Sequence, residues 1–275
     1  MNAIASGKGA AFGVDLSTKA EVALTDEPGF IKGEIMSDPA ESTVLIEKTV
    51  SRVFRRFKVD KRFGAKVRTW SNIPIARGLK SSSAAANAVA LATVAALGEK
   101  LGDLAIVKLG VEAAFDAKVT VTGAFDDACA SYFGGVLVTD NLRRRIVRRF
   151  ALPEGLTVLF HVPSRKAYTG DSDVARLGLV KPLVEIAYRE ALKANFWGAL
   201  SVNGMIYSAA LGFDAKVALD ALAAGALAAG LCGKGPAVTA VVADEKVDAV
   251  KMALQRYEGE VLQARFNHEK AKVIR

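Results

Sequence analysis

Hydrophobic positions recur every three or four residues in several long segments of the chain, which predicts helices. Ser42 to Phe57 has this period, and Asp103 to Ala117 has it again. Between them, Ser82 to Leu97 consists almost entirely of good helix formers, with alanine on every face, and stops before Gly98. A helix with small side chains all round can lie deep in a core, with neighbours close on every side.

Alternating apolar and polar residues predict strands in the same part of the chain. Phe63 to Ser71 alternates in this way, and the first 24 residues have a strand-like spacing with little helical period. Val136 to Thr139 and Ile146 to Phe150 read as a strand pair joined by a turn. Helices and strands are therefore mixed in the first half, which is organised around the alanine-rich helix.

The pattern changes near residue 152, where Leu-Pro-Glu-Gly leads into a buried-strand pattern. We predict a domain boundary there, with residues 1–154 and 155–275 as the two domains. The second domain reads as strand, consecutive helices, strand, helix and strand, which is the outline of a split βαβ layer. Its predicted strands are 156–162, 237–242 and 261–266, and its predicted helices are 174–177, 183–194, 195–211, 217–228 and 247–257.

Composition places the chain among globular proteins. Its 275 residues are 51% hydrophobic and 24% charged, enough for a substantial core in one large or two modest domains. The longest uncharged stretch of the second half, 221–233, is too short to span a bilayer, and no signal peptide opens the chain. The two cysteines lie in apolar surroundings, so we expect a reduced, cytoplasmic protein without a disulfide framework or a membrane partner.

The formal charge of +8 can indicate nucleic acid, a membrane surface or anionic small molecules as partners. The positive residues gather at 52–62 and 143–149, and neither segment is interleaved with the aromatic platforms that single-strand binders use. We interpret both segments as solvated faces, with steering of an anionic substrate as the alternative.

A loop with proline, glycine and three serines leads into the alanine-rich helix. Pro74 fixes its own backbone, and Gly78 permits a turn that a Cβ would hinder. A helix N-terminus exposes unpaired N–H groups and a partial positive charge, so it can hold a phosphate. The alternative is a buried helix without a ligand, but capping needs only one hydroxyl. The loop is neither a Walker A sequence nor a dinucleotide fingerprint; its residues are Pro74, Ile75, Ala76, Arg77, Gly78, Leu79, Lys80, Ser81, Ser82, Ser83 and Ala84.

Two adjacent carboxylates, Asp126 and Asp127, stand between a glycine and an apolar run. Neighbouring side chains diverge, so one aspartate can face a cleft while the other stabilises the start of the next helix. Two helix-capping aspartates without chemistry are the alternative.

The loop at 74–84 resembles the nucleotide-binding loop of the GHMP kinases, such as galactokinase, homoserine kinase, mevalonate kinase and phosphomevalonate kinase. That loop usually reads Pro-x-x-x-Gly-Leu-x-Ser-Ser-Ala, and this chain has one extra serine. Three further segments are similar to the family: Ala-Ser-Gly-Lys at 5–8, the aspartate segment at 123–135, and Gly-Lys-Gly-Pro-Ala-Val at 233–238. The segments occur in family order, so the resemblance covers the whole chain.

The resemblance implies an α+β, two-domain GHMP kinase fold. The N-terminal domain would be ribosomal protein S5 domain 2-like, and the C-terminal domain a ferredoxin-like split βαβ layer. It also implies an ATP-dependent and Mg²⁺-dependent transfer of phosphate to a hydroxyl group of a small molecule. We expect a monomer or a homodimer.

Several catalytic residues follow from the resemblance. Asp127 matches the family's base, because serine follows four residues later and glycine seven, while Asp126 misses both offsets by one. Lys8 matches a lysine that several members place near the transferred phosphoryl group. The metal ligands implied are a hydroxyl of Ser82 or Ser83 and an acidic residue on the preceding helix, for which Asp116 is the first choice and Glu112 the second.

The acceptor is less well defined. Segments 77–83 and 122–128 are most similar to archaeal-type shikimate kinases, which implies shikimate as the hydroxy acid substrate. The substrate-binding candidates are Gly233, Lys234 and Gly235 beside the phosphates, with Arg165, Lys166 or Arg77 for the acceptor carboxylate. Homoserine, mevalonate or pantoate are alternative acceptors. A basic nucleic-acid-binding protein is the alternative from another class, but paired aspartates would repel a phosphate backbone.

Overall fold

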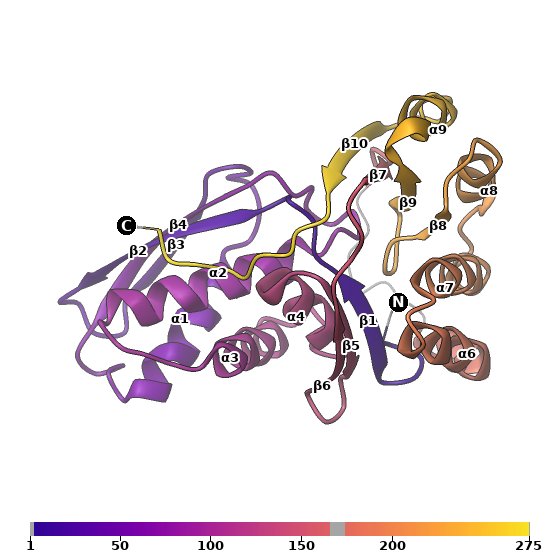
Figure 1. Ribbon diagram of the computed structural model, residues 1–275. Helices are drawn as coiled ribbons and strands as arrows, with labels where there is room; N and C mark the ends of the chain where they lie inside the picture. Colours follow the sequence, from indigo (N-terminus) through magenta and orange to yellow (C-terminus); the bar gives the residue numbers. More distant parts are fainter. Residues whose placement is uncertain (1–2, 166–173, 275) are drawn as a thin grey trace.

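The computed structural model describes residues 3–165 and 174–274, which form two lobes (Figure 1). In the N-terminal lobe, two three-stranded sheets are separated by helices, with strand orders β2-β4-β3 and β1-β5-β6. Its strands are β1 (Lys8–Phe12), β2 (Thr18–Thr25), β3 (Ile31–Ile35), β4 (Gly64–Ser71), β5 (Val136–Asp140) and β6 (Arg145–Phe150). Its helices are α1 (Val44–Phe57), α2 (Ser81–Ala96), α3 (Asp103–Asp116) and α4 (Phe125–Phe133).

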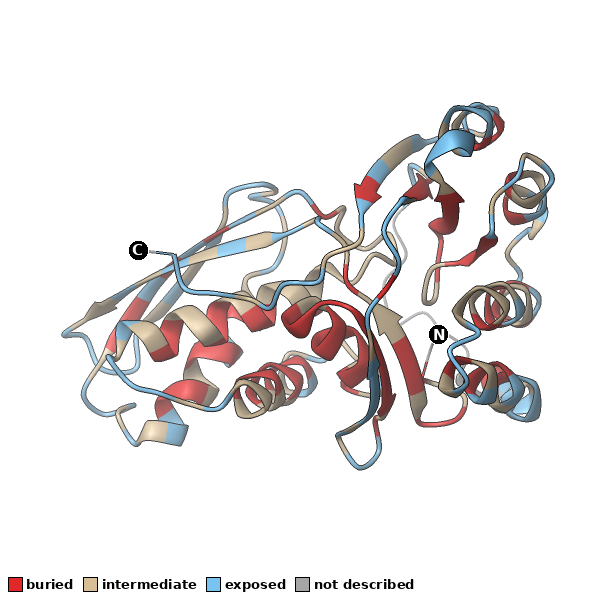
Figure 2. Ribbon diagram, in the orientation of Figure 1, coloured by how far each residue is buried: buried red, intermediate tan, exposed pale blue. Residues whose placement is uncertain are grey.

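The alanine-rich helix α2 lies at the centre of this lobe, as its pattern predicts. It packs against β2 of the first sheet and against α1, α3 and α4. The helix α4 in turn covers β1 and β5 of the second sheet, and its residues are almost all buried (Figure 2). Small side chains let these helices approach closely, and Gly110 of α3 lies directly against Ala86 of α2.

The C-terminal lobe is a four-stranded antiparallel sheet in the order β10-β7-β9-β8, flanked by helices. This order is that of a ferredoxin-like split βαβ layer, in agreement with the predicted outline. Its strands are β7 (Leu156–Val162), β8 (Ala228–Leu231), β9 (Val238–Ala243) and β10 (Glu260–Arg265). Its helices are α5 (Val174–Leu179), α6 (Lys181–Leu192), α7 (Phe196–Leu211), α8 (Lys216–Ala223) and α9 (Val247–Leu254), with a short 3-10 turn at Asp244–Lys246.

Two strands are missing from the sequence prediction. The strand β3 has no predicted counterpart, and the predicted helix 217–228 stops at Ala223, before the strand β8. Alanine favours a helix, but Gly225 has a φ of +106°, which does not fit a helix, so the helix cannot continue through it. Gly230 of β8 then lies against Gly204 of α7, where an added Cβ on Gly204 would stand 2.4 Å from the Cα of Gly230. Tertiary packing therefore overrides local propensity here.

After β10 the chain returns to the N-terminal lobe as an extended segment, Asn267–Lys272, which we call the tail (Figure 1). The backbone N–H of Asn267 donates to the carbonyl of Gly13, and its carbonyl accepts from the N–H of Gly135. The N–H of Ala271 donates to the carbonyl of Tyr132 at 2.6 Å. The predicted division at 154/155 falls between β6 and β7, and it stays a prediction.

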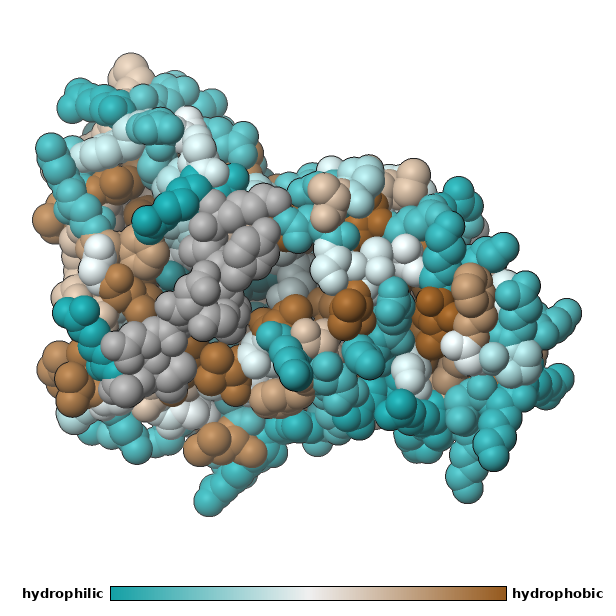
Figure 3. Space-filling view, turned by 180° about the vertical axis from the view of Figure 1, so that it is seen from behind, coloured by the Kyte–Doolittle hydropathy of each residue, from teal (hydrophilic) through white to brown (hydrophobic). Residues whose placement is uncertain are grey.

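On the face opposite to that of Figure 1, hydrophobic side chains form a band between hydrophilic margins (Figure 3). Within the described ranges, no helix is long and apolar enough to cross a bilayer.

Candidate active site

The loop before α2 folds against the glycine segment before β9. Gly78 has a φ of +90°, and an added Cβ would stand 2.7 Å from the carbonyl oxygen of Cys232 and 2.8 Å from that of Gly235. The N–H of Ala237 donates to the carbonyl of Arg77 at 3.1 Å. Glycine at 78 is therefore required both by its backbone conformation and by the close approach. The structure brings together two of the segments that resemble the family.

The start of α2 has no side-chain cap. Its N-cap residue is Lys80, with a φ of 68°, and no side-chain oxygen caps the helix in the described structure. The first turn also contains no acidic residue. Because neither a hydroxyl nor a carboxylate neutralises this N-terminus, its partial positive charge remains available to an anion.

The start of α4 has the opposite character. Asp126 and Asp127 lie in its first turn and are 2% and 9% exposed. Carboxylates are stabilised near a helix N-terminus, where the helix dipole is positive. Ala124 precedes the helix in a left-handed conformation, with a φ of 47°, and the carboxylate of Asp127 reaches Lys80 at the start of α2.

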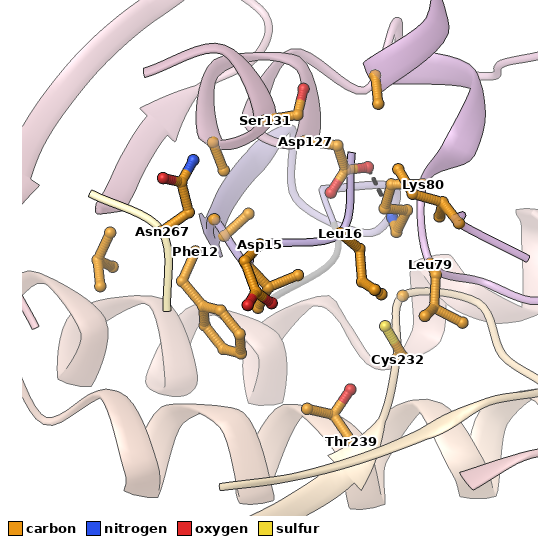
Figure 4. Close-up of a pocket in the computed structure, with 18 of the residues that line it drawn as sticks. Phe12, Asp15, Leu16, Leu79, Lys80, Asp127, Ser131, Cys232, Thr239 and Asn267 are labelled. Carbon is orange, nitrogen blue, oxygen red and sulfur yellow. Dashed lines mark hydrogen bonds and ion pairs between the residues drawn. The ribbon is translucent and has the colours of Figure 1, made fainter. Parts of the chain in front are cut away.

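Lys80 joins the two helix starts. Its Nζ lies 2.6 Å from Oδ2 of Asp127, and both side chains are largely buried (Figure 4). Burial by itself lowers the pKa of the Lys80 ammonium. The negative charges of Asp127 and Asp126 raise this pKa by more than burial lowers it, so the net shift is upward. Lys80 therefore stays protonated, as a fixed positive charge between α2 and α4.

Asp126 is held from the other side. Its Oδ1 accepts a hydrogen bond from Nδ2 of Asn141 at 2.8 Å, and Oδ1 of Asn141 accepts one from the hydroxyl of Thr139 at 2.7 Å. Burial, followed by the charge of Asp127, raises the pKa of Asp126 to about 6, against the opposing effects of Lys80 and Asn141.

Two cavities meet at this cluster. The first, of about 450 Å³, is lined by the serine run and both helix starts, and we call it the loop cavity. The second, of about 470 Å³, is lined by β1, α7 and the tail, and we call it the tail cavity (Figure 4). Thr18, Lys80 and Asp127 line both cavities. The lysine–aspartate pair is thus accessible from two separate spaces.

The loop cavity is suited to an anion with an apolar end. Lys80, Lys118 and Lys234 supply positive charge to its walls. At its other walls, exposed valines offer a surface for a flat apolar group: Val44, Val119 and Val121 are 37–40% exposed. Strained backbone also gathers here. Four lining residues other than glycine have a positive φ, namely Ala76, Lys80, Lys118 and Ala124.

The predicted loop residues divide between the cavities. Lys80 lines both, and Pro74 and Arg77 line neither. The loop cavity is lined by Ile75, Ala76, Gly78, Ser81, Ser82 and Ser83, and the tail cavity by Leu79 and Ala84. Of the later glycine segment, Lys234 and Gly235 line the loop cavity and Gly233 the tail cavity.

The structure does not place Lys8 beside the aspartates. Its Nζ lies 3.9 Å from a carboxylate oxygen of Glu185 and 5.6 Å from the ring centre of Tyr188, both on α6. The strand β1 packs against α6 and carries Lys8 toward it. The lysine in contact with Asp127 is Lys80, and the expected role of Lys8 near the transferred phosphoryl group stays a prediction.

Asp116 and Glu112 are also turned away. The guanidinium of Arg52 on α1 contacts Asp116 at 2.5 Å and Glu112 at 3.4 Å, and neither acid lines the loop cavity. Their neighbours Ala114 and Ala117 do line it. The helix position thus directs alanine toward the cavity and the two acids toward α1, so their prediction as metal ligands has no geometric support.

The arginines expected to bind the acceptor carboxylate, Arg165 and Arg77, line neither of the two cavities. The guanidinium of Arg165 lies 5.6 Å from the ring centre of Phe213 and lines neither cavity. Lys166 lies outside the described residues. Their proposed role stays a prediction.

Sequence reasoning missed three asparagine and threonine side chains around the site. Asn87 on α2 donates to the carbonyl of Ala128 at 2.8 Å and to the hydroxyl of Ser131 at 2.7 Å, which ties α2 to α4. A lone asparagine within an alanine run was the available signal. Asn141 and Thr139 had none, because they lie in an ordinary strand and turn.

Comparison with known proteins places the chain in a family. Residues 44–135 match the family model described as the GHMP kinases N terminal domain. The shikimate kinase of Methanosarcina mazei is 45% identical and that of Methanosarcina acetivorans 48%, in each case over 98% of this chain and 92% of the relative.

Solved structures show the same fold. Homoserine kinase from Cytophaga hutchinsonii has a TM-score of 0.75 at 20% identity, over 96% of this chain and 91% of that one. Mevalonate kinase from Methanococcus jannaschii has a TM-score of 0.78 at 17% identity, over 96% and 93%. The predicted fold and family are confirmed. The chain belongs to the GHMP kinases and, within them, to the family of the archaeal shikimate kinases.

Proposed function

We propose that this kinase transfers the γ-phosphoryl group of ATP to a hydroxyl of shikimate, giving shikimate 3-phosphate and ADP. The names of its relatives support the substrate. The main structural support for phosphoryl transfer is that Lys80 and Asp127 line two adjoining cavities. Two reactants can then meet at one lysine–aspartate pair.

The nucleotide occupies the loop cavity in this proposal. Its phosphates lie at the uncapped start of α2, where free N–H groups, Lys80, Lys118 and Lys234 compensate their charge. Its base lies against Val44 and the neighbouring valines. An adenine ring needs such an apolar wall, and phosphates need the opposite end.

The acceptor occupies the tail cavity. Oδ2 of Asp127 contacts Lys80, and the other carboxylate oxygen is turned away from the lysine (Figure 4). An acceptor hydroxyl in the tail cavity can donate to that oxygen. The apolar walls then face the carbon ring of the substrate, and Ser131 and Thr239 add hydroxyl groups to the lining of the same cavity.

Phosphoryl transfer needs positioning and compensation of charge more than covalent help from the protein. Asp127 accepts the proton of the hydroxyl as it attacks, and Lys80 compensates the charge that gathers on the phosphoryl oxygens. Mg²⁺ fits the hydroxyls of Ser82 and Ser83, which are hard oxygen donors lining the loop cavity, and its other ligands would be phosphate and water oxygens. When bound with phosphates and water, it would neutralise negative charge on the nucleotide.

The change Asp127→Asn tests the base. We expect a fall in kcat of roughly 10²- to 10⁴-fold, the usual weight of a general base, with ATP affinity largely kept. The measurement is shikimate-dependent ADP release, together with an ATP titration. Turnover at the wild-type rate would refute the assignment, and a loss confined to Asp126→Asn would move the base by one residue.

A crossed pair of variants tests the two cavities. Leu16 lines the tail cavity and Val44 the loop cavity. Leu16→Trp should raise the KM for shikimate at least about 10-fold and leave that for ATP within about 3-fold, because it fills only the acceptor space. Val44→Trp should do the reverse. The same split in both variants would contradict the placement of the substrates.

A panel of acceptors tests shikimate itself. Shikimate, homoserine, mevalonate and pantoate are each supplied with ATP and scored by ADP release. Release with shikimate alone supports the proposal. Release only with another acid would refute shikimate while leaving the kinase chemistry in place.

A further inference from the structure

A series of hydrogen-bonded, buried polar side chains runs from the end of β5 to Asp126, beside the lysine–aspartate pair. Thr139, Asn141 and Asp126 are at most 4% exposed and are joined by hydrogen bonds of 2.7 and 2.8 Å. The backbone N–H of Asn141 also donates to the carbonyl of Gly7 at 2.9 Å, just before β1. Asn141 is therefore held at its backbone and at both ends of its amide.

The orientation of the Asn141 amide follows from this series. The hydroxyl of Thr139 can donate or accept and lies within hydrogen-bond distance of both Asn141 Oδ1 and the carbonyl of Gly9, whereas the carboxylate of Asp126 can only accept, so the NH₂ group of Asn141 faces Asp126. An amide turned the other way would bring two acceptors together at Asp126. Asn141 therefore donates a hydrogen bond to the carboxylate of Asp126 from one defined direction.

Gly9 closes the space around Asp126. An added Cβ at Gly9 would stand within van der Waals overlap of Oδ2 of Asp126. One oxygen of Asp126 thus lies against the backbone of β1 and the other against Asn141, so the carboxylate has little room to turn.

This arrangement is costly if it serves the fold alone. A buried carboxylate loses its hydration, and an uncharged pair of similar size would fill the same space at a lower cost. Among the described residues, Asp126 has no ion-pair partner within 4 Å, because the nearby Lys80 contacts Asp127 instead. Asp126 and Lys80 nevertheless line the same loop cavity, and the negative charge of Asp126 helps to raise the pKa of Lys80.

We propose that Asn141 is a positioning residue for the phosphoryl transfer, which holds Asp126 as a second, fixed negative charge behind Lys80. With Asp126 held in place, Lys80 stays oriented at the junction of the two cavities, and Asp127 keeps one oxygen for the acceptor hydroxyl. Asn141 itself touches neither cavity. This inference rests on the proposed function.

Exchanging the side chains of Asp126 and Asn141 tests this positioning role. Asn141→Leu removes the donor, and the double variant Asp126→Asn with Asn141→Asp restores one hydrogen bond but moves the charge from α4 to the end of β5. We expect Asn141→Leu to lower kcat at least about 10-fold, with the KM values for ATP and shikimate changed less than about 3-fold. The double variant should recover much of the thermal stability lost in Asn141→Leu, yet keep the low kcat.

Thr157→Val is the matched control. The buried Thr157 donates to a carboxylate oxygen of Asp244 at 2.8 Å and lines neither cavity. This variant loses a comparable hydrogen bond, so it should lose stability without the fall in kcat.

The outcomes separate the possibilities. Recovery of kcat together with stability in the double variant would show a merely structural pair and overturn the proposal, as would an unchanged kcat in Asn141→Leu. Absence of shikimate-dependent turnover in the wild-type enzyme, which is measured first, would instead overturn the proposed function.

Discussion

Three ionisable side chains, Lys80, Asp126 and Asp127, share a small buried space at the residue scale. Among the described residues, two carboxylates face one ammonium in this space. Burial makes each of these interactions stronger than at the surface, and it makes the unpaired carboxylate costly. Lys80 contacts Asp127, so Asp126 bears most of that cost, and its pKa is raised to about 6.

This shift gives a prediction for stability against pH. The pKa of Asp126 is higher in the folded protein than its ordinary value of 3.8, so its contribution to stability is complete below about pH 4 and is lost as the pH rises through about 6. Asp126→Asn lacks this group. The free energy of unfolding of wild type minus that of the variant should therefore fall by more than about 1 kcal/mol from pH 5 to pH 7.5.

Urea denaturation of both proteins across this pH range measures the difference. Titrating groups remote from Asp126 are common to the two proteins and cancel in this difference. A difference that does not change with pH would show that the carboxylate keeps an ordinary pKa.

At the scale of elements, the site is made by two helix starts that use the same dipole in different ways. The start of α4 holds carboxylates of the chain itself, whereas the start of α2 is left uncapped. Asn87 ties the two helices together. Their separation therefore depends on packing between helices and on the glycine loop that closes over the start of α2.

The contact between this loop and the later glycine segment can be tested with Gly78→Ala. The variant must accept both a positive φ and overlap with two carbonyl oxygens, so we expect a loss of stability of about 1–3 kcal/mol and a weaker affinity for ATP. Gly98→Ala is the control. Gly98 has a φ of +71° and no atom within 4 Å of an added Cβ, so it should lose stability through backbone strain but bind ATP normally.

Thermal unfolding and an ATP titration measure both effects. Equal ATP affinity in the two variants would mean that the close approach of the two loops does not shape the nucleotide site.

At the scale of the whole molecule, the tail connects the two lobes. It leaves the C-terminal sheet after β10, contacts Gly13 and Gly135, and forms one wall of the tail cavity. Lys270 also contacts Asp103 on α3 at 2.9 Å. The proposed acceptor site is thus completed by the segment farthest along the chain.

Truncation after Phe266 tests this role of the tail. We expect a lower melting temperature and a KM for shikimate raised at least about 10-fold, with ATP affinity largely kept, because only the acceptor cavity loses a wall. Truncation after Lys272 is the control, since it leaves the lining residues in place. Normal acceptor kinetics in the shorter chain would place the acceptor elsewhere.

Local features of this protein were predictable from its sequence. The helical period predicted α1 and α3, and the run of good helix formers predicted α2, each to within a few residues. The serine run and the aspartate pair indicated the family. Such signals arise from nearby residues, because period, propensity and loop chemistry act over a few positions. The alanine-rich composition of α2 similarly indicated a central helix.

Only the tertiary structure decided which side chains meet. Lys80 and Asp127 are 47 residues apart, and no local pattern shows that this lysine, and not Lys8, contacts the aspartate. Asp116 was expected as a metal ligand from the resemblance, and no local pattern showed that it contacts Arg52 on α1. The sequence by itself thus determined the helices, the motifs and the family, whereas folding decided the pairing of charges and the junction of two cavities, because both depend on contacts between distant segments.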